Sequence, residues 1–301
     1  MKKLSIGSWA FVFNQEHVAD FHTILHKLQH LKFDGVELGG FDPHPNPATH
    51  DRKQRASLKK EVADHGLQFS GLAADLWKMK LISVEDSGPY IAEFAKNLFF
   101  AEDLGIEMIR VDSVEPPDIF EQTGLDPKVG FDRCVRAWNL CSKLAADRGI
   151  RVTWEFEPGF AFNKPSEIVA MVDAVRALGN PNFGIMFDTC HAHLCAAKAA
   201  RQPGAKEILK GGAMELLELL KGRINHVHLI DSDGSLNEHQ TSTHNPFGTG
   251  ELNFDQLLPA LAKANIPNDW WTIDLCFWPD AWSVTADAKR FLNDKCKQLG
   301  L

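Results

Sequence analysis

A helical segment gives way to a strand at Asp103-Leu104-Gly105-Ile106-Glu107-Met108. The glycine tolerates the left-handed backbone that ends a helix, and the apolar residues after it have the pattern of a buried strand. The same pattern recurs at residues 64–69 and 147–152, so that Gly66, Gly105 and Gly149 are spaced by 39 and 44 residues. An interval of that length fits one strand, one helix and their loops. The repeat therefore predicts a chain built of successive strand–helix units.

Short β-rich runs occur at eight places in the sequence, and helical patterns alternate with them. The expected strands are Leu4–Ser8, Gly35–Leu38, Gln68–Gly71, Met108–Val111, Val152–Glu155, Phe183–Phe187, Ile224–Leu229 and Trp271–Leu275. The expected helices are Val18–Leu31, Ser57–Asp64, Tyr90–Leu104, Phe131–Arg148, Ser166–Leu178, Ala205–Leu220, Phe254–Ala264 and Val284–Leu299. Right-handed crossovers make such strands parallel, and eight units close into a (β/α)8 barrel. No linker-like segment divides the chain, so we expect one α/β domain over residues 1–301, a single TIM barrel.

The composition excludes several classes of protein. The 301 residues carry 32 Lys and Arg against 40 Asp and Glu, a formal charge of −8, which argues against a nucleic-acid partner. No stretch approaches the roughly 20 apolar residues of a membrane span, so we expect no membrane association. The six cysteines form no CxxC pair. We interpret them as the reduced thiols of a cytoplasmic protein.

Acidic and imidazole groups occupy the ends of the last four predicted strands. Catalytic side chains of this fold lie at the C-terminal strand ends. Four residues at these ends are the main candidates for metal ligands: Glu155, Asp188, His228 and Asp274. Crowded carboxylates repel one another unless a cation or protons neutralise them. Three carboxylates and one imidazole suit a divalent ion, with Mn²⁺ as the first candidate and Co²⁺, Mg²⁺ or Zn²⁺ as the others.

Four motifs in the second half of the chain resemble those of the sugar phosphate isomerase/epimerase superfamily, the xylose-isomerase-like TIM barrels. They are Trp154-Glu155-Phe156-Glu157-Pro158, Phe187-Asp188-Thr189-Cys190-His191, His226-Val227-His228-Leu229-Ile230-Asp231 and Phe247-Gly248-Thr249-Gly250-Glu251-Leu252-Asn253-Phe254. The resemblance implies that the four residues named above bind one divalent metal ion, and that His191 holds a substrate oxygen. Most relatives have Glu on the eighth strand, where this chain has Asp274. The shorter acid leaves open which group acts as the second acid or base.

The chemistry expected of such a site is proton transfer next to a carbonyl group. A metal chelated by a carbonyl and its adjacent hydroxyl stabilises an enediolate, while one carboxylate removes a proton and another returns it. We assign these roles to Glu155 and Asp274. The function predicted is isomerisation or epimerisation of a carbohydrate or polyol-derived ketone. Loss of a leaving group from the same intermediate would instead make the protein a dehydratase or lyase on a keto-sugar, keto-glycoside or keto-inositol.

Five further side chains are candidates for substrate contacts: Trp9, Arg110, Glu157, Asp231 and His244. Trp9 is expected in a loop at the mouth of the barrel, where its ring can stack on a sugar face. The other four each have an alternative role. Arg110 either binds an anion or forms an ion pair with Asp112 or Glu107, and the ion pair is favoured. Glu157 either binds a substrate hydroxyl or braces its loop. Asp231 either orients His228 or His191 or caps its own loop, and His244 either closes over the site or is solvated.

Two rival functions are less well supported by the sequence. Abasic-site endonucleases with three zinc ions also carry an Asp-Thr-Cys-His segment, but their Asp-Arg-His corresponds here to Ser242-Thr243-His244, without the aspartate. The third and fourth strands also lack the histidines that such a cluster needs. An inactive barrel scaffold is the second rival, which Asp274 favours and the retained metal-site residues oppose. A homo-oligomer is compatible with either kind of protein.

Overall fold

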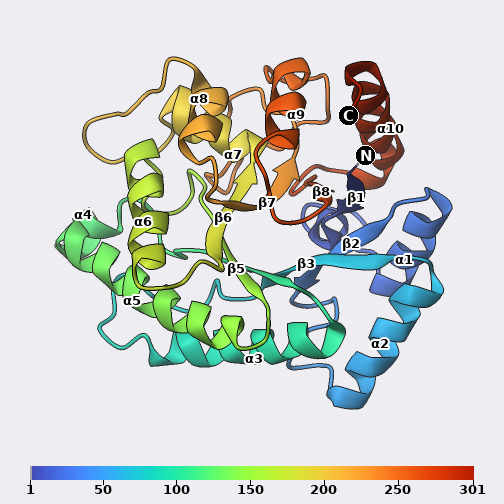
Figure 1. Ribbon diagram of the computed structural model, residues 1–301, viewed down its shortest axis with the longest axis horizontal. Coiled ribbons are helices and arrows are strands. Elements are labelled where there is room, and N and C mark those ends of the chain that lie inside the picture. Colours follow the sequence, from blue (N-terminus) through green and yellow to red (C-terminus); the bar gives the residue numbers. More distant parts are fainter. Residues whose placement is uncertain (1) are drawn as a thin grey trace.

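Eight parallel strands surround the centre of this computed structural model, which describes residues 2–301 (Figure 1). The strands are β1 (Lys3–Ile6), β2 (Gly35–Gly40), β3 (Gln68–Ala74), β4 (Met108–Val111), β5 (Arg151–Glu155), β6 (Phe183–Asp188), β7 (Ile224–Leu229) and β8 (Trp270–Ile273). Each strand pairs with the next in the chain from β2 to β8, and β8 pairs with β1. Between β1 and β2, a bridge from Gly7 to Glu37 brings the ring close to closure. The predicted α/β TIM barrel is therefore confirmed.

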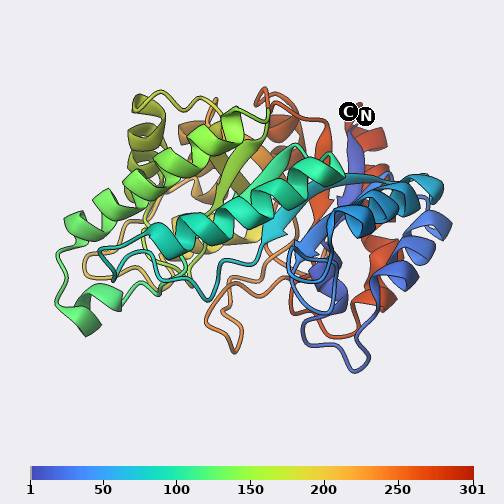
Figure 2. The ribbon, with the colours of Figure 1, turned by 90° about the horizontal axis from the view of Figure 1, so that it is seen from below.

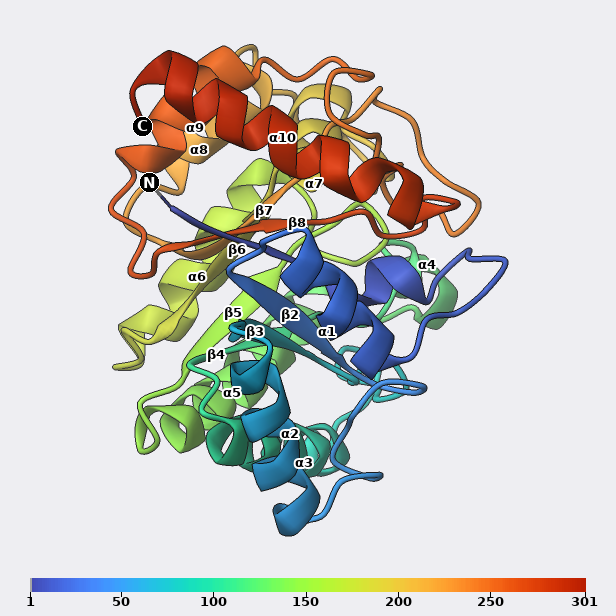
Figure 3. The ribbon, with the colours of Figure 1, turned by 90° about the vertical axis from the view of Figure 1, so that its right-hand side faces the viewer.

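Helices follow the strands and cover the outside of the barrel (Figure 2). They are α1 (Phe21–His30), α2 (Arg52–Asp64), α3 (Gly88–Leu104), α4 (Ile119–Thr123), α5 (Pro127–Ala146), α6 (Pro165–Ala177), α7 (Thr189–His193), α8 (Gly212–Leu219), α9 (Phe254–Ala262) and α10 (Ala281–Leu299). The start of β1 and the end of α10 lie near each other in all three views, which places the two ends of the barrel sequence side by side (Figure 3). None of the described helices is long and apolar enough to cross a membrane.

Local backbone structure explains why two helices begin later than expected. The first helix begins at Phe21 rather than at Val18, because the Asp20 carboxylate accepts the Thr23 N–H at 2.9 Å and starts the helix there. The helix expected over Ala205–Leu220 is confined to α8. Gly212 has a positive φ of 56°, so the chain before it cannot continue the helix. The short helix α7 after β6 lies outside the expected helices, and it bears on the site.

Large aromatic side chains fill the layer between the strands and the helices. Trp154 on β5 is fully buried and packs against Trp138 of α5, with ring centroids 5.2 Å apart and the rings tilted by 37°. The inside of the barrel also contains polar side chains. Among them are Ser5 and Thr272, whose buried hydroxyl groups hydrogen-bond each other at 2.7 Å. This packing fixes the strand ends, and the strand ends position the candidate site.

Candidate metal centre and active site

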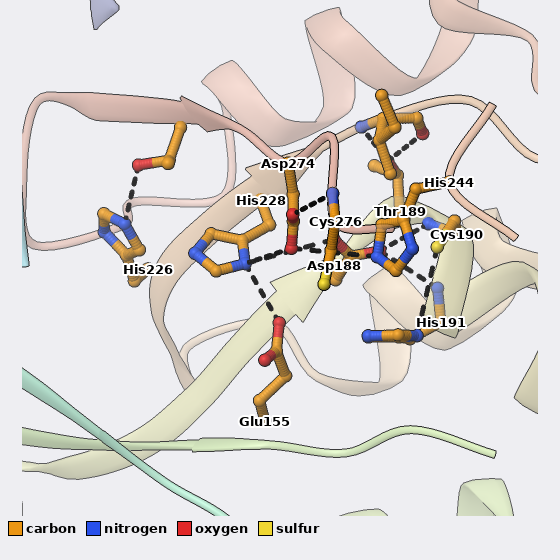
Figure 4. A network of polar contacts seen from close by, with 12 residues as sticks. Glu155, Asp188, Thr189, Cys190, His191, His226, His228, His244, Asp274 and Cys276 are labelled. Carbon is orange, nitrogen blue, oxygen red and sulfur yellow. Dashed lines mark hydrogen bonds and ion pairs between the residues drawn. The ribbon is translucent and has the colours of Figure 1, made fainter. Parts of the chain in front are cut away.

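Four predicted ligands from four strands lie together at the C-terminal mouth of the barrel (Figure 4). Glu155 and Asp188 are the last residues of β5 and β6, His228 is the fifth residue of β7, and Asp274 follows β8 directly. One possible ligand atom from each of these side chains lies within 4.8 Å of the others. All four are buried. We call this group the acid–histidine cluster.

Two carboxylates of the cluster are each held by one oxygen and leave the other toward the centre. Asp188 Oδ1 accepts the backbone N–H groups of Cys190 at 2.7 Å and His191 at 3.0 Å, in the first turn of α7. Asp274 Oδ1 accepts the Trp9 indole N–H at 2.8 Å and the backbone N–H two residues further on at 2.9 Å. These contacts leave Oδ2 of each aspartate available to a ligand.

Glu155 is held in the same manner by Arg110. The Arg110 guanidinium lies 2.7 Å from Glu155 Oε2, 3.0 Å from Asp112 and 3.9 Å from Glu157. The ion pair with Asp112, one of the two roles considered for Arg110, is therefore present, and the guanidinium also lines the cavity described below. Although burial opposes ionisation, Arg110 and His228 together lower the pKa of the Glu155 carboxyl to about 2. Glu155 is thus an anion at neutral pH.

The imidazole of His228 is oriented by a carboxylate from the far side of the barrel. Its Nε2 lies 3.1 Å from Glu37 Oε2, which also contacts His226 Nε2 at 2.8 Å. Its Nδ1 faces the cluster, 3.0 Å from Glu155 and 3.4 Å from Asp274. Although burial opposes it, the surrounding carboxylates Glu37, Glu155 and Asp274 raise the pKa of His228 well above its usual value. A cation bound to the cluster would take the place of the proton on Nδ1, while Nε2 donates to Glu37. No pattern in the sequence indicates that Glu37 contacts these histidines, because Glu37 and His226 are 189 residues apart in the chain.

Three atoms of the cluster are buried without a hydrogen-bond partner among the described residues: Glu155 Oε1, Asp188 Oδ2 and His228 Nδ1. Burial of unpaired polar atoms is costly, and burial of several acceptors facing each other more so. A divalent cation would satisfy all of them at once. Three carboxylate oxygens and one imidazole nitrogen are a suitable donor set for such an ion. The residues present therefore fit the predicted metal.

Two further histidines border the cluster on the side of α7. His191 Nδ1 hydrogen-bonds the Ser242 hydroxyl at 2.8 Å, while His244 Nδ1 donates to the Ser242 carbonyl at 3.0 Å. His244 Nε2 is buried, has no hydrogen-bond partner among the described residues, and lies 3.7 Å from Asp274 Oδ2. The two rings are perpendicular, with centroids 5.1 Å apart. The loop between β7 and α9 thus brings His244 next to His191, as closure over the site would require.

A cavity of about 650 Å³ opens above the cluster. Its lining includes seven residues that the sequence singled out for catalysis or substrate contact: Trp9, Arg110, Glu155, Glu157, His191, His244 and Asp274. Glu157 accepts a hydrogen bond from the Thr241 hydroxyl, so it also braces the loop after β7. Burial raises the pKa of the Glu157 carboxyl to about 8, despite the nearby Arg110 guanidinium. This acid is therefore largely protonated at neutral pH.

Asp231 is placed differently from the substrate contact considered for it. Its two carboxylate oxygens accept the backbone N–H groups of Ser232, Gly248, Gly250 and Leu252 at 2.8–3.1 Å. It does not line the cavity, and its carboxylate makes none of the described contacts with His228 or His191. The structure thus gives Asp231 the loop-capping role, in which it ties the start of the loop after β7 to the glycine-rich turn before α9.

Known proteins share this architecture. The chain matches the xylose isomerase-like TIM barrel family over residues 25–293. No curated protein sequence matches it. The crystal structure of a D-tagatose 3-epimerase-like protein is similar with a TM-score of 0.74 and 17% identity, covering 100% of this chain and 98% of that chain. An IolI protein with a bound zinc atom gives a TM-score of 0.73 at 18% identity, covering 99% and 98%. A D-psicose 3-epimerase, solved in the presence of D-fructose, gives 0.71 at 18% identity, covering 100% of both chains.

Proposed function

Because the chain belongs to the xylose isomerase-like TIM barrel family, we propose that it is a divalent-metal-dependent isomerase or epimerase that acts on a keto-sugar or a polyol-derived ketone. The observation that carries the proposal is the acid–histidine cluster, in which two aspartates and one glutamate are each anchored by one oxygen. The epimerases among the similar structures support the reaction class, and the zinc in the IolI protein supports the metal.

The proposed metal ligands are Glu155, Asp188, His228 and Asp274. A divalent ion bound there would act as a Lewis acid that stabilises negative charge on the substrate oxygens. Glu37 keeps the His228 proton on Nε2, so that Nδ1 stays available. The backbone of α7 and the Trp9 indole fix the two aspartates in position before substrate arrives.

Proton transfer is assigned to Glu155 and Asp274, whose strands flank the other two ligands. The Glu155 carboxylate is ionised and can accept a proton from the carbon next to the carbonyl. Although burial raises it, the neighbouring His244 and His228 and the hydrogen bond from Trp9 hold the pKa of the Asp274 carboxyl below its usual range, so Asp274 is likewise an anion. As an anion it first takes up a proton from solvent, and it can then deliver that proton to the substrate from the opposite side. His191, held by Ser242 through Nδ1, is placed to bind a substrate hydroxyl.

Hydrogen exchange with solvent tests this proposal. Protein loaded with Mn²⁺ is incubated in D₂O with a panel of keto-sugars and keto-inositols, and the products are analysed by NMR and mass spectrometry. We expect deuterium at the carbon next to the carbonyl, with conversion to an epimer or to the isomeric aldose. Glu155→Gln should abolish the exchange, whereas Glu61→Gln, a change on the outer surface of α2, should not.

Other results would contradict the proposal in different ways. Loss of water or of a substituent together with exchange would show a dehydratase or lyase. No exchange with any compound, at a measured occupancy of one metal ion per chain, would favour an inactive scaffold.

A further inference from the structure

Part of the cavity above the cluster is lined by aromatic rings. They come from the loops after β1, β2, β3 and β8, and they are Phe13, Phe41, Trp77 and Phe277. Phe13 lies at the centre of the group, with ring centroids 5.4 Å from Phe41, 5.8 Å from Trp77 and 5.2 Å from Phe277. Phe41 and Trp77 are 4.9 Å apart. We call these four residues the aromatic wall.

The aromatic wall and the acid–histidine cluster belong to one cavity. Trp9 joins them, because its indole N–H donates to Asp274 while its ring packs in the same apolar group as Phe41 and Phe13. A ligand bound at the cluster can therefore extend along the wall without leaving the cavity. The volume of about 650 Å³ is that of a site for a drug-sized molecule, and a single sugar ring would fill only a small part of it.

The wall offers little to a sugar hydroxyl group. Its one polar ring atom, the Trp77 indole nitrogen, already donates to Asp112 at 3.1 Å. The other three rings carry no polar atom, and the polar side chains that line the cavity beside the wall are Asn14 and His239, whose ring centroid lies 4.5 Å from that of Phe277. A flat aromatic group would instead stack on the rings in the offset or tilted arrangements that they already adopt with each other. Trp77 remains exposed at the mouth, with 37% of its surface accessible.

We propose that the substrate is a carbohydrate that bears an aryl group, with the sugar at the acid–histidine cluster and the aryl group on the aromatic wall. This inference rests on the proposed function, because it takes the cluster as the site of the sugar. It goes further in assigning the substrate class. An aryl glycoside, in which the ring is attached directly or through one oxygen to the sugar, has the required shape.

Binding of unreactive glycosides tests the assignment without any need for turnover. Calorimetry compares phenyl β-D-glucopyranoside, methyl β-D-glucopyranoside and phenol on the Mn²⁺-loaded protein. We expect the phenyl glycoside to bind at least about tenfold more tightly than the methyl glycoside, since stacking on even one or two rings supplies that difference. Phenol alone should bind more weakly than the phenyl glycoside, because it lacks the sugar.

Two leucine substitutions locate the effect. Trp77→Leu and Phe277→Leu together should bring the ratio of the two glycoside affinities close to one, while the methyl glycoside keeps its wild-type affinity. Phe99→Leu, an equivalent change of an exposed ring on α3, should leave the ratio unchanged. Equal affinities in the wild type, or no measurable binding of the phenyl glycoside, would overturn the proposal.

A variant of the cluster separates this inference from the proposed function. Asp188→Asn removes a proposed metal ligand and should stop proton exchange, yet it lies outside the wall and should retain the preference for the phenyl over the methyl glycoside. Failure of the exchange experiment together with a retained phenyl preference would reject the reaction and leave the aryl site. Exchange on free keto-sugars without a preference for the phenyl glycoside would support the reaction and reject the aryl site.

Discussion

Asp274 is the residue on which the proposed chemistry depends most, because each of its oxygens has a separate task. Oδ1 is fixed by the Trp9 indole and the Cys276 backbone N–H, while Oδ2 lies 3.4 Å from His228 Nδ1. The indole of Trp9 thus sets the position of an acid that is one methylene shorter than the glutamate of related proteins. The contact with Trp9 thus fixes one oxygen of this shorter side chain, as the proposed chemistry requires.

Substitution of Asp274 tests both tasks. Asp274→Asn keeps the shape but removes a charged ligand and a base, so turnover should fall by at least about 10²–10⁴-fold even in saturating metal. Asp274→Glu should still bind metal but lose activity, because the extra methylene cannot keep both the Trp9 contact and the position of the free oxygen. Steady-state kinetics and metal titration of each variant provide the measurement. Wild-type turnover in the Asn variant would reduce Asp274 to a packing residue and pass its role to Glu157.

Glu37 is expected to act through His228 as a positioning residue. In Glu37→Gln the side chain keeps its size but loses the charge that holds the imidazole proton on Nε2, so we expect about 10–100-fold weaker Mn²⁺ binding with the fold retained. Calorimetric titration with Mn²⁺ measures this. The matched control is Glu61→Gln, which removes a surface carboxylate 2.6 Å from His22 Nδ1. An unchanged dissociation constant in Glu37→Gln would exclude the positioning role.

Among the elements, the loop from β7 to α9 supplies several side chains that line or support the cavity at the mouth of the barrel. It supplies Thr241, which contacts Glu157, and both Ser242 and His244, which surround His191. Asp231 holds the two ends of this loop together through backbone N–H groups. The position of the substrate-facing side chains therefore depends on one buried carboxylate that does not touch the cavity.

Replacement of Asp231 by asparagine should loosen this loop. One of its two acceptor oxygens becomes an NH₂ group that faces backbone N–H donors, which should cost about 1–3 kcal/mol of unfolding free energy. Urea denaturation followed by circular dichroism measures the change. Asp233→Asn, at an exposed site in the same loop where the carboxylate accepts from Ser235, should have a smaller effect. Equal losses in the two variants would contradict the capping role.

The sequence predicted the strands well and the irregular connections poorly. Seven expected strands agree with the observed ones within about two residues and the third extends three residues further, because short apolar runs between turn signals are typical of buried parallel strands. The short α7 was missed because its five α-helical residues pass directly into a π-helical segment, Leu194–Lys198, so that no regular α-helical period develops. Its N-cap is Asp188, so the proposed metal ligand also begins this helix.

At the site, the sequence identified residues at strand ends and could not identify contacts across the barrel. Trp9 was expected near a sugar, but its hydrogen bond to Asp274 joins residues 265 positions apart. The pairing of Glu37 with two histidines depends in the same way on closure of the ring. The aromatic wall gathers residues from four separate loops, and no spacing in the sequence connects them.

At the scale of the whole molecule, different parts of the chain supply the two sides of the cavity at the mouth of the barrel. The strands β5–β8 and their ends supply the acid–histidine cluster, while the loops after β1, β2, β3 and β8 supply the aromatic wall. The ends of the chain meet at the β1–β8 pair, so Trp9 from the first unit completes a site built by the last four. The proposed substrate would therefore contact both halves of the chain.

The stability of the whole barrel should depend on pH through His44, in the loop after β2. Burial lowers its pKa from 6.5 to about 4, against the smaller effects of the Ala19 carbonyl at 3.2 Å and the nearby Asp20. Between these values the unfolded chain binds more protons, so the free energy of unfolding falls as the pH is lowered through that window, by on the order of 3 kcal/mol in the limit.

Urea denaturation at several pH values checks this expectation. The wild type should lose more stability between pH 7 and 4 than His44→Gln, which has no titrating group at that position. His22→Gln, a change at an exposed histidine of α1, is the control for the loss of an imidazole from the surface. Parallel pH profiles for the wild type and His44→Gln would contradict the expectation.

The central claim is that one divalent ion binds to Glu155, Asp188, His228 and Asp274 together. Crystals of the protein soaked in Mn²⁺, with diffraction data collected at the manganese absorption edge, locate the ion directly. We expect one strong anomalous peak per chain among these four side chains. The peak should be lost in Asp188→Asn and unchanged in His193→Gln, whose histidine contacts Glu251. A peak elsewhere, or none among the four residues at saturating Mn²⁺, would contradict it.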